Sequence, residues 1–121
     1  KYNMKFTYDK KKKMSTLFNN GEVFPLETSV EYTIGGVVSK QITKSPAGNV
    51  TLFSFDKGQG LTEHTASFDA MVQILDGVAE IHIDGVPRLV KKGECIIMPA
   101  NHPHALHAVE PFKMLLIMIK G

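Results

Sequence analysis

Histidine is the residue type with the most chemical potential in this 121-residue chain, and two stretches hold most of its histidines. The first, GQGLTEHTASFDAMVQILDG, runs from Gly58 to Gly77 and contains His64. The second, GECIIMPANHPHALHA, runs from Gly93 to Ala108 and contains His102 and His104. Imidazole nitrogens bind metal ions and exchange protons near neutral pH. The two stretches therefore predict a metal site or a pair of hydrogen-bonding or acid–base groups.

Nucleophilic catalysis has little support in the sequence. The only cysteine, Cys95, lies in the apolar stretch CIIM without a basic neighbour that would lower its pKa, so we expect a small buried residue. A single cysteine forms no internal disulfide, which fits a cytoplasmic protein. No G-x-S-x-G motif occurs, and the glycines at 58 and 60 precede a predicted strand, whereas phosphate-binding loops open a helix.

The distribution of charge argues against nucleic acid and membrane as partners. Six of the 14 basic residues but only one of the 12 acidic residues precede Met14, so the remaining chain is mildly acidic. A nucleic-acid-binding domain needs a basic surface on its folded part. We interpret residues 1–14 as a basic tail or extension and residues 15–121 as a single domain. The longest apolar run, 114–119, is too short to span a bilayer.

Short β-rich segments separated by turn residues fill the rest of the chain. Asp84-Gly85, for example, predicts a tight hairpin. We expect strands over residues 37–44, 50–56, 61–66, 70–75, 78–83, 86–90, 94–98, 104–109 and 112–120. Many short strands at regular spacing indicate an all-β sandwich or barrel.

The last predicted strand, FKMLLIMIK, is apolar on both faces. A strand of this kind is typical of the centre of a sheet with both faces covered. One cover is the core, and the other is expected to be a second copy of the chain. The sequence therefore predicts a homodimer.

The two histidine-containing stretches resemble the two motifs of the cupin family. The residues that fit the motifs at the right intervals are Gly58, His64 and Gly77 in the first, and Gly93, Pro99 and His104 in the second. With the flanking strands, the resemblance covers roughly residues 35 to 120. It implies a double-stranded β-helix, the jelly-roll barrel of the cupins, with His64 and His104 on neighbouring strands.

The departures from the motifs concern the metal site. In the family, two histidines and a glutamate of the first motif bind a divalent metal together with the histidine of the second. Here Ala66 replaces the second histidine and Ala70 replaces the glutamate, so the usual site is incomplete. His102 is the candidate third ligand beside His64 and His104, because residues two apart on a strand point the same way. The ion would be Zn, Mn, Fe or Ni.

These replacements also leave space beside His64, which suits an organic ligand. We therefore expect a small-molecule-binding barrel in which His64 and His104 supply hydrogen bonds. The residues expected to line the pocket with them are Ala66, Val72, Ile74 and Leu106. One alternative is a metal-dependent enzyme of the oxygenase, isomerase or decarboxylase type, and another is a non-catalytic interaction module.

Overall fold

The computed structural model describes residues 18–120, which form nine β-strands and one short 3₁₀ helix, η2 (Glu27–Ser29). The strands are β1 (Val37–Ser45), β2 (Gly48–Phe55), β3 (Gly60–His64), β4 (Asp69–Asp76), β5 (Val78–Ile83), β6 (Val86–Lys91), β7 (Cys95–Met98), β8 (His104–His107) and β9 (Phe112–Ile119). All nine strands predicted from the sequence are present, with ends that differ by a few residues. The predicted basic tail, residues 1–14, lies outside the described residues.

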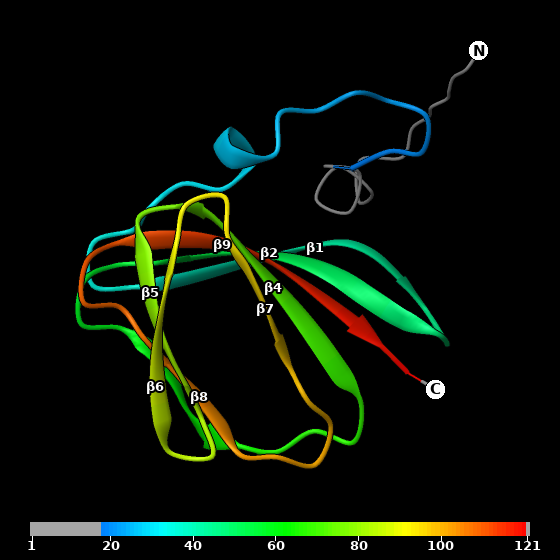
Figure 1. The fold of residues 1–121 in the computed structure, drawn as a ribbon. Coiled ribbons are helices and arrows are strands. Elements are labelled where there is room, and N and C mark those ends of the chain that lie inside the picture. The colour runs from blue at the N-terminus through cyan, green and yellow to red at the C-terminus, as the bar shows by residue number, and fades with distance from the viewer. Residues whose placement is uncertain (1–17, 121) are drawn as a thin grey trace.

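The strands form two antiparallel sheets that curve around a common interior (Figure 1). The five-stranded sheet has the order β1-β2-β9-β4-β7, and the four-stranded sheet has the order β3-β8-β5-β6. The barrel predicted from the sequence is therefore confirmed. Within residues 18–120, no helix is long and apolar enough to cross a membrane.

The core fills one part of the space between the sheets. Phe55 stacks on Phe112 with ring centroids 4.6 Å apart and on Phe53 at 5.7 Å. The other core residues are aliphatic side chains and methionines that come from both sheets: Ala70, Val72, Ile74, Ala79, Ile81, Val90, Met98, Leu106, Ala108 and Met114. Burial of these apolar side chains is the main force that holds the sheets together.

Strand β9 occupies the centre of the five-stranded sheet, as its two apolar faces predict. Its inner face contributes Met114, which is fully buried in the core. Part of its outer face is covered by the segment that precedes β1. Lys113 donates a hydrogen bond from Nζ to the Glu27 carbonyl (2.8 Å), and Ser54 on β2 donates one to the Glu31 carbonyl (2.8 Å). These contacts fix residues 27–31 against the back of the sheet.

Two turns carry non-glycine residues in the left-handed region of backbone space. Asp84 (φ 54°) and Gly85 (φ 77°) form the tight hairpin between β5 and β6, as predicted. Asn101, in the turn before β8, has φ 65°. Asparagine tolerates this conformation better than most residues, which suits it to this turn.

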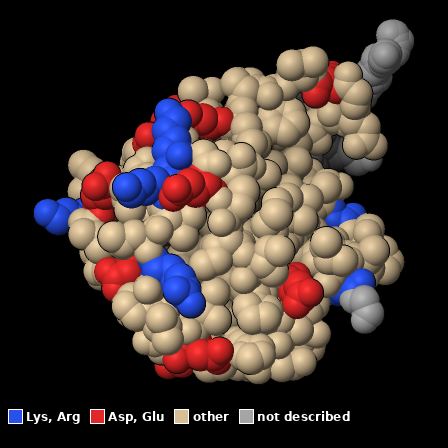
Figure 2. Space-filling model, viewed as in Figure 1, with Lys and Arg blue, Asp and Glu red and all other residues tan. Residues whose placement is uncertain are grey.

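The prediction that Cys95 is buried is wrong, because its side chain is exposed. Strand β7 lies at the edge of the five-stranded sheet, and alternation turns Met98 and Ile96 inward and Cys95 and Ile97 outward. On the face of the molecule in Figure 2, basic and acidic side chains are interspersed, and a broad area beside them carries neither.

Candidate functional site

His64 and His104 lie together at one end of the four-stranded sheet. Their ring centroids are 4.4 Å apart, and the rings meet edge to face at 68°. The two residues are direct partners in the pairing of β3 with β8. His104 is only 4% exposed, whereas His64 is exposed. The pair therefore reaches from the solvent to the interior.

Short loops hold the ends of these strands in place. The residue that ends β3 is His64, and the residue that begins β8 is His104, so both lie where regular pairing stops. The Asn101 amide donates to the Ala66 carbonyl (2.7 Å), which ties the loop after β3 to the turn before β8. The Asp69 carboxylate accepts a second hydrogen bond from the Ala100 amide (2.8 Å). These bonds join the two segments that carry the histidines.

Hydrogen bonds to the backbone define the tautomer of both rings. Nδ1 of His64 lies 2.7 Å from the Thr62 carbonyl oxygen, and Nδ1 of His104 lies 3.2 Å from the His102 carbonyl oxygen. A carbonyl oxygen only accepts, so each Nδ1 carries a proton and donates it. In a neutral ring the other nitrogen, Nε2, then presents a lone pair. Both histidines are thus prepared to accept a hydrogen bond or to bind a metal ion through Nε2.

The environment keeps His104 neutral over a wider pH range than a free histidine. Burial lowers the pKa of His104, because a charged imidazolium loses hydration there. The hydrogen bond to the His102 carbonyl favours the charged form and opposes this effect, whereas the nearby ring of His64 lowers the pKa further. Desolvation is the largest of the three causes, so the lowered pKa follows from the position of His104 in the barrel.

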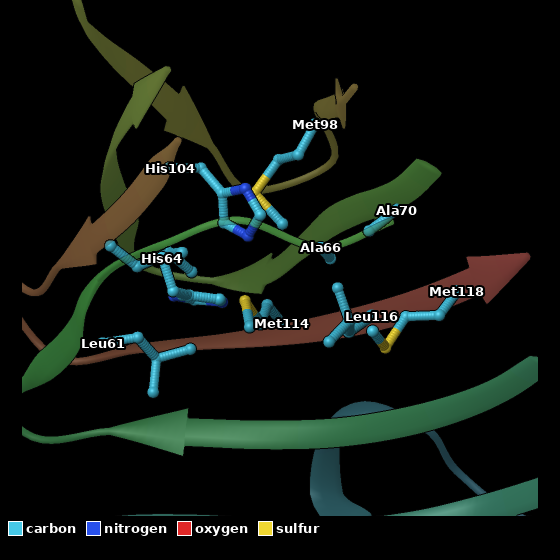
Figure 3. A pocket seen from close by; sticks show the side chains of 10 residues that line it. Leu61, His64, Ala66, Ala70, Met98, His104, Met114, Leu116 and Met118 are labelled. Carbon is cyan, nitrogen blue, oxygen red and sulfur yellow. The ribbon is translucent and has the colours of Figure 1, made fainter. Parts of the chain in front are cut away.

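A cavity of about 100 Å³ opens beside the two rings, and Figure 3 shows both directed into it. Its walls come from both sheets and from the loop after β3. The lining residues are Leu61, His64, Ala66, Ala70, Met98, His104, Leu106, Met114, Leu116 and Met118. The two imidazoles are the only polar side chains in this set, so the cavity is an apolar pocket with one polar end.

The structure brings some of the predicted pocket residues together and separates others. Ala66 and Leu106 line the cavity with the two histidines. Val72 and Ile74 face inward on β4 but are fully buried in the packed core and do not line the cavity. The prediction that Val72 and Ile74 line the pocket is therefore wrong. Alternation identifies the inner face of a strand, but it does not show which part of that face borders the cavity.

His102 does not join the pair, which corrects its prediction as a third ligand. Its ring is exposed, and its Nδ1 lies 2.9 Å from a carboxylate oxygen of Asp84 in the β5–β6 hairpin. Strand β8 begins only at His104, so His102 belongs to the preceding turn and the alternation argument does not apply to it.

Sequence reasoning missed Leu61 and Leu116 as lining residues. Leu61 lies on β3, three residues before His64, and an irregularity in pairing between these residues defeats simple alternation. Leu116 lies on β9, which is apolar on both faces, so the pattern of the strand does not identify its inner side. Met114, Leu116 and Met118 are spaced two residues apart and therefore point to the same side of β9. If Met114 is known to face inward, Leu116 is expected to face inward as well.

The divalent metal site implied by the motifs does not fit the residues present. Within residues 18–120, no group of three or more His, Cys, Asp or Glu side chains is placed to hold a metal ion. Ala66 and Ala70 lie in the pocket wall and supply no donor atom. Catalytic zinc sites keep about three protein ligands, and two imidazoles fall short of that number.

Comparison with known proteins assigns this architecture to a family. A model of the cupin domain matches residues 51–119, which include both histidine-containing stretches. No curated protein matches the chain. A conserved protein of unknown function from Streptococcus pyogenes is 40% identical, and the match covers 86% of this chain and 91% of that one with a TM-score of 0.81.

Two further solved structures have the same fold. A cupin 2 conserved barrel domain protein from Leptotrichia buccalis is 48% identical over 80% of this chain, with a TM-score of 0.78, but the match spans only 47% of that longer protein. A cupin superfamily protein from Desulfitobacterium hafniense is 27% identical over 86% of this chain and 95% of its own, with a TM-score of 0.80. The two antiparallel sheets are therefore a double-stranded β-helix, and the chain belongs to the cupin family.

Proposed function

We propose that this protein binds a compact, largely apolar molecule carrying a hydroxyl group, with that hydroxyl donating a hydrogen bond to Nε2 of His104 or His64. The observation that carries the proposal is the pair of hydrogen bonds between the Nδ1 atoms and backbone carbonyl oxygens. Both Nδ1 atoms are bonded to backbone carbonyls, so two acceptor nitrogens remain for the pocket.

The polarity of the wall supports an uncharged ligand. Among residues 18–120, no lysine or arginine lines the cavity, and the two histidines are its only polar side chains. A carboxylate or phosphate would lose its hydration without gaining a fixed positive partner, which is costly. A hydroxyl group loses less hydration and regains one hydrogen bond at an imidazole nitrogen.

The cavity volume of about 100 Å³ supports a small ligand. An apolar engineered cavity of about 150 Å³ binds benzene. The present cavity is smaller but open to solvent beside the exposed His64, so a single six-membered ring can place its hydroxyl group at the imidazoles while part of the ring stays outside. Sugars and nucleotides are larger and more polar than this space accommodates.

Phenol and anisole test the proposal, because anisole has a similar ring and oxygen atom but lacks the donated proton. We expect phenol to bind more tightly in calorimetric titrations, by up to roughly tenfold for a single hydrogen bond. His104→Leu should remove most of this preference. The matched control is His107→Leu, which changes an exposed histidine on the same strand and should preserve it.

Equal affinities for phenol and anisole, or no heat of binding for either ligand at millimolar concentration, would contradict the proposal. An unchanged preference for phenol in the His104→Leu variant would do the same. Thermal denaturation of each variant, monitored by circular dichroism, checks that the barrel remains folded.

A further inference from the structure

Thioether sulfur atoms share the pocket with the two histidines. Three methionines line it, and two of them are almost completely buried: Met98 is 3% exposed and Met114 is 0% exposed. Figure 3 shows the sulfur atoms of Met98 and Met114 at the end of the pocket that holds the two rings, with Met118 beyond Leu116 toward the other end. The polar end of the cavity therefore contains sulfur as well as nitrogen.

The two kinds of donor come from opposite walls of the barrel. His64 and His104 lie on β3 and β8 of the four-stranded sheet, whereas Met98 and Met114 lie on β7 and β9 of the five-stranded sheet. A small guest between the sheets can thus be approached by imidazole from one side and by thioether from the other. Met118 is four residues beyond Met114, a distance of about 13 Å along an extended strand.

This donor set is neutral and contains no oxygen. Hard cations such as Mg²⁺, Ca²⁺ and Mn²⁺ are bound mainly by carboxylate, carbonyl and water oxygens. Thioethers are soft ligands that select Cu⁺, and imidazole also binds copper. A monovalent ion also loses less hydration free energy than a divalent ion on entering an apolar pocket, and bonds from imidazole nitrogen and thioether sulfur replace part of that hydration.

We propose that His64, His104, Met98 and Met114 form a Cu⁺ site, with Nε2 of each imidazole and at least one of the two sulfur atoms as ligands. The replacement of the usual ligands by Ala66 and Ala70 then changes the selectivity of the pocket from divalent to soft monovalent metal. This inference goes beyond the organic ligand proposed above and does not depend on it.

Anaerobic titration with Cu⁺ in competition with the chromophoric chelator bicinchoninate tests the site. We expect one Cu⁺ per chain and its loss in the His104→Ala variant. Met98→Leu and Met114→Leu together should lower the affinity by more than the roughly tenfold that loss of an outer-shell partner causes. Met118→Leu is the matched control, because it removes a sulfur from the same wall, and we expect an affinity within about twofold of the wild type, as leucine conserves the volume of methionine.

A second measurement does not depend on variants. With ¹³C-methyl-labelled methionine, addition of Cu⁺ should shift the methyl resonances of Met98, Met114 or both. The resonance of Met71, which lies on β4 between two inward-facing residues and does not line the pocket, should stay unchanged. Wild-type Cu⁺ affinity in the Met98→Leu/Met114→Leu variant, or methyl resonances unchanged by Cu⁺, would overturn the proposal. So would tighter binding of Zn²⁺ than of Cu⁺ by the wild type. Phenol binding is measured in metal-free buffer and Cu⁺ binding in the absence of phenol. The failure of the organic-ligand proposal is thus distinguished from the failure of the Cu⁺ proposal.

Discussion

His64 and His104 are direct cross-strand partners whose ring centroids lie 4.4 Å apart, one ring exposed and the other buried. Two positive charges at this separation repel each other, and the neighbouring ring of His64 contributes to the lowered pKa of His104. His104 therefore takes up a proton less readily than an isolated histidine.

The stability of the fold should fall in mild acid because of His104. Burial lowers its pKa in the folded protein below the ordinary value of 6.5, so the unfolded chain binds the proton more readily. The stability that the neutral ring provides is fully present above about pH 6.5 and is lost as the pH falls from there to the lowered pKa. Urea denaturation at several pH values between 8 and 5 measures the loss.

The loss should be smaller in the His104→Gln variant, because glutamine does not titrate. His107→Gln is the control, since His107 is exposed on the same strand and should retain the wild-type pH dependence. A wild type that is more stable at pH 5 than at pH 8, or a His104→Gln variant with the full pH dependence, would contradict the prediction.

Ala70→Glu should create a divalent metal site. Ala70 lines the pocket and stands where the family motif has its glutamate ligand, so the variant adds a carboxylate to His64 and His104. The metal-free variant should lose about 1–3 kcal/mol of stability from the buried polar group. Zn²⁺ or Mn²⁺ should restore it, by about 2.7 kcal/mol at a concentration of 100 times Kd.

Thermal denaturation with and without metal provides the measurement for Ala70→Glu. The control is Ala70→Gln, which adds similar bulk without the charged ligand. If Ala70→Glu and Ala70→Gln respond equally to metal, the carboxylate does not complete the site and the prediction is wrong.

Gly77→Ala should destabilise the barrel strongly. Gly77 joins β4 to β5 with φ +76°, and a Cβ there would lie 2.1 Å from the Pro111 carbonyl oxygen. Gly85 has nearly the same φ, +77°, but a Cβ there meets nothing within 4 Å. Gly85→Ala should therefore cost only the roughly 1–2 kcal/mol of left-handed backbone strain, and Gly77→Ala clearly more. Equal losses in urea denaturation would show that the clash is relieved without cost.

The homodimer predicted from the sequence places a second copy on the outer face of the five-stranded sheet. Ile97 and Ile119 are 62% and 64% exposed on this face. Sedimentation should show a dimer for the wild type and a monomer for Ile97→Lys. Leu89→Lys is the control, because Leu89 is 63% exposed on β6 of the other sheet. A wild type that is monomeric at all concentrations would contradict this prediction.

The fold was predictable because its information is local. Turn residues such as Asp84 and Gly85 mark the strand ends, and alternation along each strand marks the inner face. Strand β9 illustrates the same point, since its two apolar faces predict a central position and it lies third of five. The pairing of His64 with His104 came from the resemblance to the family motifs, because no local pattern indicates which distant strands become neighbours.

The rest of the site depends on details that a pattern does not contain. Val72 and Leu116 are neighbours on adjacent strands with side chains on one face, yet only Leu116 borders the cavity. Which inward residue meets empty space depends on the volumes of all its neighbours. His102 was mispredicted for a different reason. Strand β8 begins two residues after it, so the His102 ring is not held in the strand and contacts the Asp84 carboxylate instead. Cys95 is exposed because β7 lies at a sheet edge, which its apolar sequence does not indicate.

The tautomer and accessibility of the two rings are tested most directly by long-range ¹H–¹⁵N NMR of the imidazole nitrogens in metal-free protein at pH 8. Both His64 and His104 should carry the proton on Nδ1, and phenol should shift at least one of their Nε2 resonances. The resonances of His82 and His107, which do not line the pocket, should stay in place. If the proton of His104 is on Nε2, or if saturating phenol leaves the Nε2 resonances of both His64 and His104 unchanged, the two rings do not present hydrogen-bond acceptors to the pocket and the proposed binding mode is wrong.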